Sequence, residues 1–309
     1  MNHVHGTVAI LLVSWCCAAV LMAAAPGPVS LTPAERAAVL KEIQQDRTDT
    51  EKWLASDPTS YLATVDRQDF GRRTTLTVGR AADNDLRIDA PDVLPHHLRV
   101  TVEGERFRVQ AVDAAATFIA GAEPTRAAVV APSTLRVGRF TLRLSHQGFP
   151  AIIVFDPKSP HFAQYKGLKY FPADLAFRYE LALTPNPHPE TVTVLSTRGN
   201  QRRATRVGWF DFAVNGQSAR LEALRLLEPG VGEDDLGIFF RDATTGKESY
   251  PLGRYVDVKK LANGRYLLDF NTAYNPACAF SDHYNCPIPP RENVLPMAIR
   301  AGEMDAHYH

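Results

Sequence analysis

The sequence contains little cysteine. Two of its four cysteines, Cys16 and Cys17, lie in an apolar N-terminal run, so only Cys278 and Cys286 remain in the rest of the 309 residues. Structural zinc normally takes four ligands, mostly Cys and His, and only His283 and Asp282 lie close to this pair. We therefore expect no metal. The alternatives for the pair are a disulfide or two reduced, inert thiols.

No excess of charge is present either, because Lys+Arg and Asp+Glu both number 34. Nucleic-acid binding needs a basic surface, so we expect no nucleic-acid partner. The one basic stretch, RGNQRRATR at 198–206, is typical of a solvated strand edge. The chain also lacks a G-x-S-x-G elbow and a nucleotide-binding loop. The sequence thus favours a non-enzymatic protein without a cofactor, and leaves catalysis open.

An N-terminal apolar run, residues 8–25, precedes Pro26 and has small residues at Ala23 and Ala25. This pattern predicts a signal peptide, residues 1–25, cleaved near Ala25 and directing a bacterial chain to the periplasm or the medium. The run is also long enough to stay uncleaved as a single membrane anchor. In an exported protein, an even cysteine pair favours a disulfide between Cys278 and Cys286.

Residues 26–59 form a linker and then a helix. Thr32, Pro33 and Glu35 make a T-P-x-E capping box, and Pro58 ends the helix. We expect this helix to dock on the domain that follows it. Residues 60–148 alternate apolar and polar positions in short runs separated by turn residues, which predicts a β-sandwich.

Residues 149–309 contain a second series of predicted strands, with hairpin turns at Asn215-Gly216 and Asn263-Gly264. The tail after Asn271 is rich in proline and therefore irregular. The fold class is mainly β: a short N-terminal helix, a β-sandwich, and an antiparallel β-barrel or β-sandwich domain under an irregular Pro-rich tail.

The segment VGRAADNDLRIDAPDVLPHHLRVTVEG (78–104) resembles a forkhead-associated domain. Gly79-Arg80, Asn84-Asp85 and His97 match that family's pattern. The resemblance implies a β-sandwich that binds phosphothreonine through an arginine and a serine. Here Leu94 stands at the serine position, so phosphopeptide binding is not expected.

The segments VFDPKSPHFAQYKGLKYFPAD (154–174), IFFRDATTGKESYPLGRY (238–255) and LDFNTAYNPACAFSDHYNCPIPPRENVLPMAIRAGE (268–303) resemble the domain of unknown function 1684 family. The resemblance implies no activity. It places any function shared with that family in the C-terminal domain.

Polar groups concentrate in these last blocks. Asp269 and Asn271 occupy alternate strand positions and so share one face, where burial would require partners such as Arg241 or Arg254. The candidate ligand-site residues are Arg241, Asp242, Glu248, Tyr250, Arg254, Asp269, Asn271 and Tyr274.

Two interpretations of this cluster remain open. It can be a hydrogen-bonded lock that holds the tail on the sheet, or a pocket whose arginines hold a small molecule or an envelope component. The second interpretation predicts an exported two-module binding protein. The alternative is a hydrolase of envelope or extracellular polymers that uses Asp242, Glu248 or Asp269.

Overall fold

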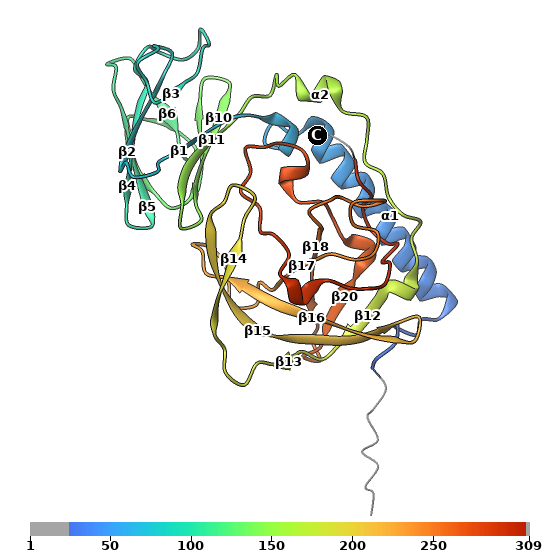
Figure 1. Ribbon diagram of the computed structural model, residues 1–309. Coiled ribbons are helices and arrows are strands. Elements are labelled where there is room, and N and C mark those ends of the chain that lie inside the picture. The colour runs from blue at the N-terminus through green and yellow to red at the C-terminus, as the bar shows by residue number, and fades with distance from the viewer. Residues whose placement is uncertain (1–24, 307–309) are drawn as a thin grey trace, which may run out of the picture.

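The computed structural model describes residues 25–306 (Figure 1). The predicted signal peptide, apart from Ala25, lies outside these residues, and so does the possible anchor. Helix α1 (Pro33–Ser56) begins at the predicted capping box: the Glu35 N–H donates to the Thr32 hydroxyl, and the Thr32 N–H donates to the Glu35 carboxylate at 2.8 Å. The local signals therefore fixed this helix correctly.

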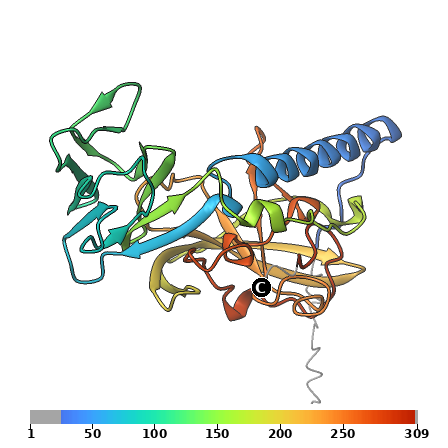
Figure 2. The ribbon, with the colours of Figure 1, turned by 90° about the horizontal axis from the view of Figure 1, so that it is seen from above.

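The expected docking partner of α1 was wrong. Val39 and Ile43 pack on Leu175, and Leu54 packs with Phe280, so the helix lies against the C-terminal domain rather than the sandwich. Figure 2 shows α1 running along this domain, with the first sandwich at one end. The apolar face of a helix specifies that it must be buried but does not specify the surface that covers it.

The first sandwich contains two sheets, ordered β1-β11-β10-β9-β6-β7 and β3-β2-β4-β5-β8. Its core includes Leu76, Val100, Phe107 and Leu142. The strands are β1 (Thr64–Asp69), β2 (Thr75–Gly79), β3 (Leu86–Arg87), β4 (Leu98–Glu103), β5 (Arg106–Ala111), β6 (Phe118–Ile119), β7 (Pro124–Thr125), β8 (Ala127–Val130), β9 (Ser133–Val137), β10 (Phe140–His146) and β11 (Pro150–Phe155).

Strand β11 belongs to this sandwich, because it pairs with β10 on one side and β1 on the other. The sandwich therefore extends to Phe155, beyond the predicted boundary at residue 148. Ile153 and Phe155 are buried on the opposite face, with Ala63 and Phe162. A strand buried on both faces is a continuous apolar run, so its sequence does not show which domain it joins.

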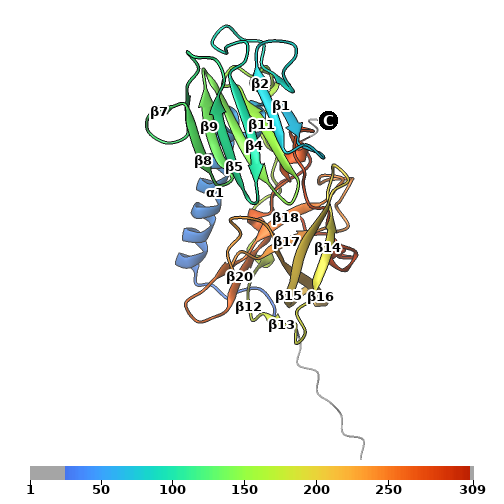
Figure 3. The same cartoon turned by 90° about the vertical axis from the view of Figure 1, so that its left-hand side faces the viewer.

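The C-terminal domain has a sheet ordered β13-β15-β16-β17-β18, with β14 paired to β15, and a smaller sheet β12-β20-β19. Figure 3 shows these sheets below the first sandwich. The strands are β12 (Arg178–Leu181), β13 (Thr184–Pro185), β14 (Thr191–Leu195), β15 (Gln201–Val214), β16 (Gln217–Leu226), β17 (Gly237–Phe240), β18 (Arg254–Asp257), β19 (Lys259–Lys260) and β20 (Tyr266–Asp269).

Both predicted hairpins are present, but the turn at Asn263-Gly264 is longer than two residues, since the Leu261 N–H donates to Arg265 O at 2.8 Å. Asn215 (φ 49°) and Gly216 (φ 78°) connect β15 to β16, and both have the positive φ of a type I′ turn. None of the sheets in residues 25–306 closes on itself, so the barrel alternative was wrong. The mainly β fold with one N-terminal helix is confirmed.

Short helices complete the chain: η1 (Tyr61–Ala63), α2 (His161–Gln164), η2 (Leu175–Phe177), η3 (Phe270–Thr272), η4 (Ala277–Ala279) and η5 (Arg291–Asn293). None of the helices within the described residues has the length and apolar composition needed to cross a bilayer.

Candidate functional site

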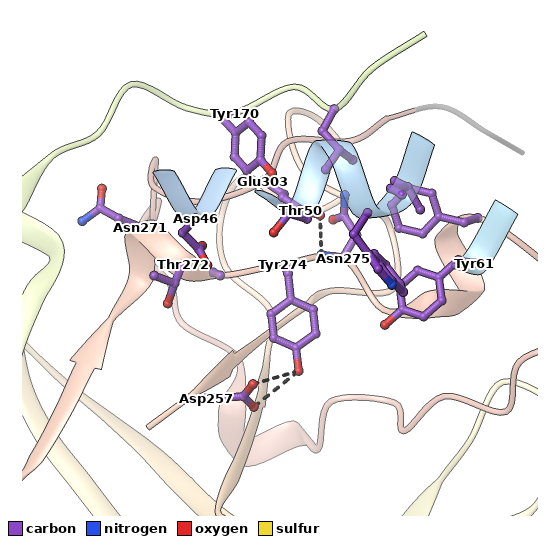
Figure 4. A pocket seen from close by; sticks show the side chains of 15 residues that line it. Asp46, Thr50, Tyr61, Tyr170, Asp257, Asn271, Thr272, Tyr274, Asn275 and Glu303 are labelled. Atoms are coloured by element: carbon purple, nitrogen blue, oxygen red, sulfur yellow. Dashed lines mark hydrogen bonds between the residues drawn. The ribbon is translucent and has the colours of Figure 1, made fainter. Parts of the chain in front are cut away.

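A cleft of about 310 Å³ lies between α1, the segment after β20 and the C-terminal tail (Figure 4). We call it the helix cleft. It is lined by Asp46, Thr50, Trp53, Leu54, Tyr61, Leu168, Tyr170, Asp257, Asn271, Thr272, Ala273, Tyr274, Asn275, Phe280 and Glu303. Aromatic rings and carboxyl groups dominate this lining.

Helix α1 forms one wall through side chains on a single face. Asp46, Thr50, Trp53 and Leu54 follow the spacing of successive helical turns. The ring of Trp53 meets Tyr61 edge to face, with 4.9 Å between ring centroids. Helix α1 can form this wall because it docks on the C-terminal domain rather than on the sandwich.

The tail forms the opposite wall as an extended strap, residues 302–304. Its backbone is held on both sides: the Glu303 N–H donates to Ala273 O at 2.8 Å, and the Met304 N–H donates to Lys169 O at 2.8 Å. These bonds place the Glu303 side chain at the cleft, where its Oε2 accepts from the Asn275 N–H at 2.8 Å. Glu303 is only 4% exposed.

Burial raises the pKa of Glu303 to about 7, although the Asn275 N–H and the charge of Arg254 act in the opposite direction. The negative charges of Asp46 and Glu51 raise this pKa further. A carboxyl group with such a pKa gains and loses its proton near neutrality.

Asn275 has a side-chain acceptor that receives no hydrogen bond from the described residues. Its Nδ2 donates to Met304 O at 2.8 Å, which fixes the orientation of the amide. Its Oδ1 is buried and has no hydrogen-bond partner within the described part of the chain. Because a buried acceptor without a donor costs about 1–3 kcal/mol, this oxygen favours a ligand or solvent molecule that donates to it.

The electrostatics of the cleft are negative. Desolvation raises the pKa of Asp257, which receives the Tyr274 hydroxyl at 3.3 Å, and desolvation together with Asp49 raises the pKa of Asp46. Among residues 25–306, no lysine or arginine lines the cleft. Arg47, outside the lining, lies over the Tyr170 ring at 4.5 Å from its centroid.

The predicted candidates divide into three groups, and the first is a buried lock. Asp242 accepts from the Thr244 hydroxyl at 2.7 Å and from the Ile299 N–H at 2.5 Å, and it faces Arg254 at 3.4 Å. The Arg254 guanidinium, 1% exposed, also donates to the carbonyls of Ala301 at 2.5 Å and Glu303 at 3.1 Å. This pair therefore holds the tail and does not line the cleft.

The second group is Asp269 and Asn271, which are buried as expected but have other partners. Asp269 pairs with Arg178 and accepts from Asn271 Nδ2 at 2.8 Å. Asn271 also bonds both backbone polar groups of Asp174. The expected partners, Arg241 or Arg254, were wrong. Asp269 instead pairs with Arg178, because β12 lies beside β20 although the two strands are far apart in sequence.

The remaining candidates do not form one cluster. Glu248 is on the surface in a two-pronged ion pair with Arg300. Arg241 donates to Leu252 O at 3.3 Å, and the Tyr250 hydroxyl donates to Cys278 O at 3.3 Å. Of all eight candidates, only Asn271 and Tyr274 line the helix cleft.

Sequence reasoning missed most of the cleft, including Asp46, Tyr170, Asn275 and Glu303. Asn275 and Glu303 lie within the family-like block 268–303 but were not distinguished there. On α1, the acidic Asp46 and the aromatic Trp53 lie on one helix face. This pattern is visible in the sequence, but the prediction of the helix from its capping box did not use it.

The two cysteines are buried neighbours. The Cys278 N–H donates to Cys286 Sγ at 3.3 Å, and both side chains are buried. A hydrogen bond from the Cys286 thiol is the main cause that lowers the pKa of Cys278. The disulfide stays a prediction.

In the first sandwich, the matched motif residues hold loops together. Asn84 Nδ2 donates to Pro95 O at 2.8 Å. His97 Nδ1 accepts from the Leu94 N–H at 3.1 Å, and its Nε2 lies 2.9 Å from Thr117 O. These contacts give Asn84 and His97 a structural role in holding the loops.

Comparisons with known proteins agree with both resemblances. A family described as "Protein of unknown function (DUF1684)" matches residues 163–304, and the FHA domain family matches residues 76–138. An uncharacterized protein of Haloarcula marismortui, solved by solution NMR, is 36% identical over 50% of this chain and 85% of its own, with a TM-score of 0.40. No curated protein matches significantly.

Residues 163–304 therefore match the DUF1684 family, and residues 76–138 form an FHA domain. The family assignment gives no activity, so function must be argued from the helix cleft.

Proposed function

We propose that this protein binds a small molecule bearing a protonated amine in the helix cleft. The observation that carries the proposal is the unpartnered Asn275 Oδ1, which lies in a cleft that offers carboxyl groups and no cationic side chain. Such a lining selects a ligand that donates hydrogen bonds and carries positive charge.

The charge balance supports a cation over a neutral molecule. Asp46, Asp257 and Glu303 line the cleft, whereas the two basic groups that act on these carboxyl groups, Arg47 and Arg254, lie outside the lining. Desolvation raises the pKa of all three carboxyl groups, and the charge of Asp46 raises the pKa of Glu303 further, so a bound cation would stabilise their ionised forms.

The aromatic walls support the same ligand class. The faces of Trp, Tyr and Phe attract cations and also cover the apolar part of an organic amine. Trp53, Tyr61, Tyr170, Tyr274 and Phe280 supply these surfaces. The stacking of Arg47 on Tyr170 is an internal example of this contact.

Calorimetric titration with 1,4-diaminobutane and the matched neutral 1,4-butanediol tests the proposal. We expect saturable binding of the diamine only, at least tenfold weaker in Glu303→Gln and unchanged in Glu248→Gln, since Glu248 lies outside the cleft. Diamine affinity should increase as pH rises through 7, because Glu303 then ionises. Equal binding of both compounds, or of neither, would contradict the proposal.

A second candidate function is hydrolysis of an envelope or extracellular polymer. One observation favours it: the Glu303 pKa of about 7 suits a general acid or base. Turnover of a chromogenic glycoside or ester that disappears in Glu303→Gln, but persists in Glu248→Gln, would support this alternative over simple binding.

Export belongs to the same proposal, and it places the ligand outside the cytoplasm. Terminal sequencing of the protein recovered from a bacterial periplasm or medium tests it. A new N-terminus near Ala25 is the expected result, whereas an intact Met1 in the cytoplasmic fraction would contradict export.

A further inference from the structure

A second pocket, of about 260 Å³, lies where the first sandwich meets the C-terminal domain. We call it the interdomain pocket. The sandwich contributes Arg67, Arg143, Ser145 and Gln147, and the C-terminal domain contributes Arg202, Tyr284, Asn285 and Cys286. Three arginines line it and no aspartate or glutamate does, which is the reverse of the helix cleft.

Two of these arginines are engaged in contacts that build the pocket. Arg67 donates to His283 O at 3.0 Å and pairs with Asp69 at 2.8 Å. Arg202 donates to Asn285 O at 3.0 Å and pairs with Glu228. Each arginine therefore fixes the backbone of the segment 283–285 from a different domain, and its charge is balanced by an acid.

The third arginine, Arg143, is exposed on β10 and forms no ion pair or hydrogen bond with any residue between 25 and 306. Arg143 is therefore the arginine of the pocket whose positive charge is not balanced by an acidic side chain. A single uncompensated guanidinium beside two neutralised ones gives the pocket a net positive charge and favours an anion.

Asn285 supplies an independent observation that also indicates a ligand. Its residue is 4% exposed, yet both Nδ2 and Oδ1 of its side chain are buried without a hydrogen-bond partner in the described part of the chain. Leaving both atoms unpaired is costly, so the Asn285 amide requires a partner that accepts from Nδ2 and donates to Oδ1.

We propose that the interdomain pocket binds a small oxyanion, a phosphate or a carboxylate, that also carries a hydrogen-bond donor. The anionic oxygens accept from Arg143 and from Asn285 Nδ2, and the donor, a P–OH or a neighbouring hydroxyl, satisfies Asn285 Oδ1. Because the two residues belong to different domains, the ligand also ties the domains together.

NMR titration of the full chain with inorganic phosphate and with glycolate, at constant ionic strength with chloride, tests this assignment. We expect a saturable shift of the Asn285 side-chain amide signals with at least one probe. Which probe binds more tightly distinguishes phosphate from carboxylate ligands. The apparent affinity should fall at least tenfold in Arg143→Gln.

Arg136→Gln is the matched control, because Arg136 is an exposed arginine on the adjacent strand β9 and does not line the pocket. It should leave the affinity unchanged. The absence of a saturable response to either probe would overturn the proposal, as would equal losses of affinity in the Arg143 and Arg136 variants. Neither result bears on amine binding in the helix cleft.

Discussion

Arg254 and Glu303 are linked through the backbone: Arg254 Nη1 donates to the Glu303 carbonyl at 3.1 Å, while the Glu303 side chain lines the helix cleft. The lock is therefore connected to a cleft, but this cleft is not the arginine-lined pocket that the sequence left as the alternative. The Arg254–Asp242 pair holds the strap, residues 302–304, and the strap places the Glu303 carboxyl group in the cleft.

Arg254→Met should strongly destabilise the protein. The substitution leaves the Asp242 carboxylate buried without its cation and removes the donors to three tail carbonyls. Loss of one partner of a buried pair costs about 3–5 kcal/mol. Urea denaturation measures it, and Arg300→Gln, which breaks only the surface pair with Glu248, should unfold like the wild type. Identical midpoints for Arg254→Met and the wild type would refute the lock.

Glu303→Gln should stabilise the protein above pH 7. The pKa of Glu303 is about 7 in the folded state and 4.5 ordinarily, so between these values the folded protein holds the extra proton. Wild-type stability therefore falls as pH rises from about 4.5 to about 7. Glu303→Gln removes this loss, a gain on the order of 2–3 kcal/mol at pH 8 and little at pH 4.5.

Denaturant unfolding at pH 4.5 and pH 8 checks this pH dependence. Glu248→Gln is the control: the Arg300 hydrogen bond lowers the Glu248 pKa, so this residue is ionised throughout the window. A Glu303→Gln variant that loses stability equally at both pH values would argue for a purely structural role of the carboxylate.

Cys278 and Cys286 should form a disulfide in protein purified from an oxidising compartment. Intact mass under non-reducing conditions should be about 2 Da below the dithiol mass, as expected for loss of two hydrogens on pairing. Reduction should cost about 2.5 kcal/mol in the chain-entropy model. A Cys278→Ser, Cys286→Ser double variant should not respond to reductant. Two alkylatable thiols in the exported protein would refute the bond.

The FHA domain should not bind a phosphothreonine peptide. Leu94 cannot donate a hydroxyl to the phosphate, and its backbone carbonyl already accepts from the Arg80 N–H at 3.0 Å. Fluorescence anisotropy with a labelled phosphopeptide should give the same flat response for the wild type and Arg80→Ala. Saturable binding that Arg80→Ala abolishes would show that the serine is dispensable.

Local signals made much of the fold predictable. The Thr32 capping box and the Asn215-Gly216 turn each depend on a few consecutive residues, and both are present. The docking of α1 and the membership of β11 depend on partners far away in the chain. Such partners cannot be identified from a run of apolar residues alone.

The candidate site was predictable only in part, for the same reason. Asp269 and Asn271 are both buried, but strand alternation is not the reason, because β20 ends at Asp269 and Asn271 lies in η3. Their partners Arg178 and Asp174 lie on distant segments. Asp46 and Glu303 are far apart in sequence, and only the tertiary fold brings them to one cleft.

The walls of the helix cleft come from opposite ends of the chain: Asp46 to Tyr61 on one side and Glu303 on the other. During synthesis on the ribosome, the first wall emerges long before the second. A nascent chain that still lacks the strap has an incomplete helix cleft, so the ligand that we propose cannot assist the folding of the earlier segments. The cleft is complete only after translation has passed Glu303.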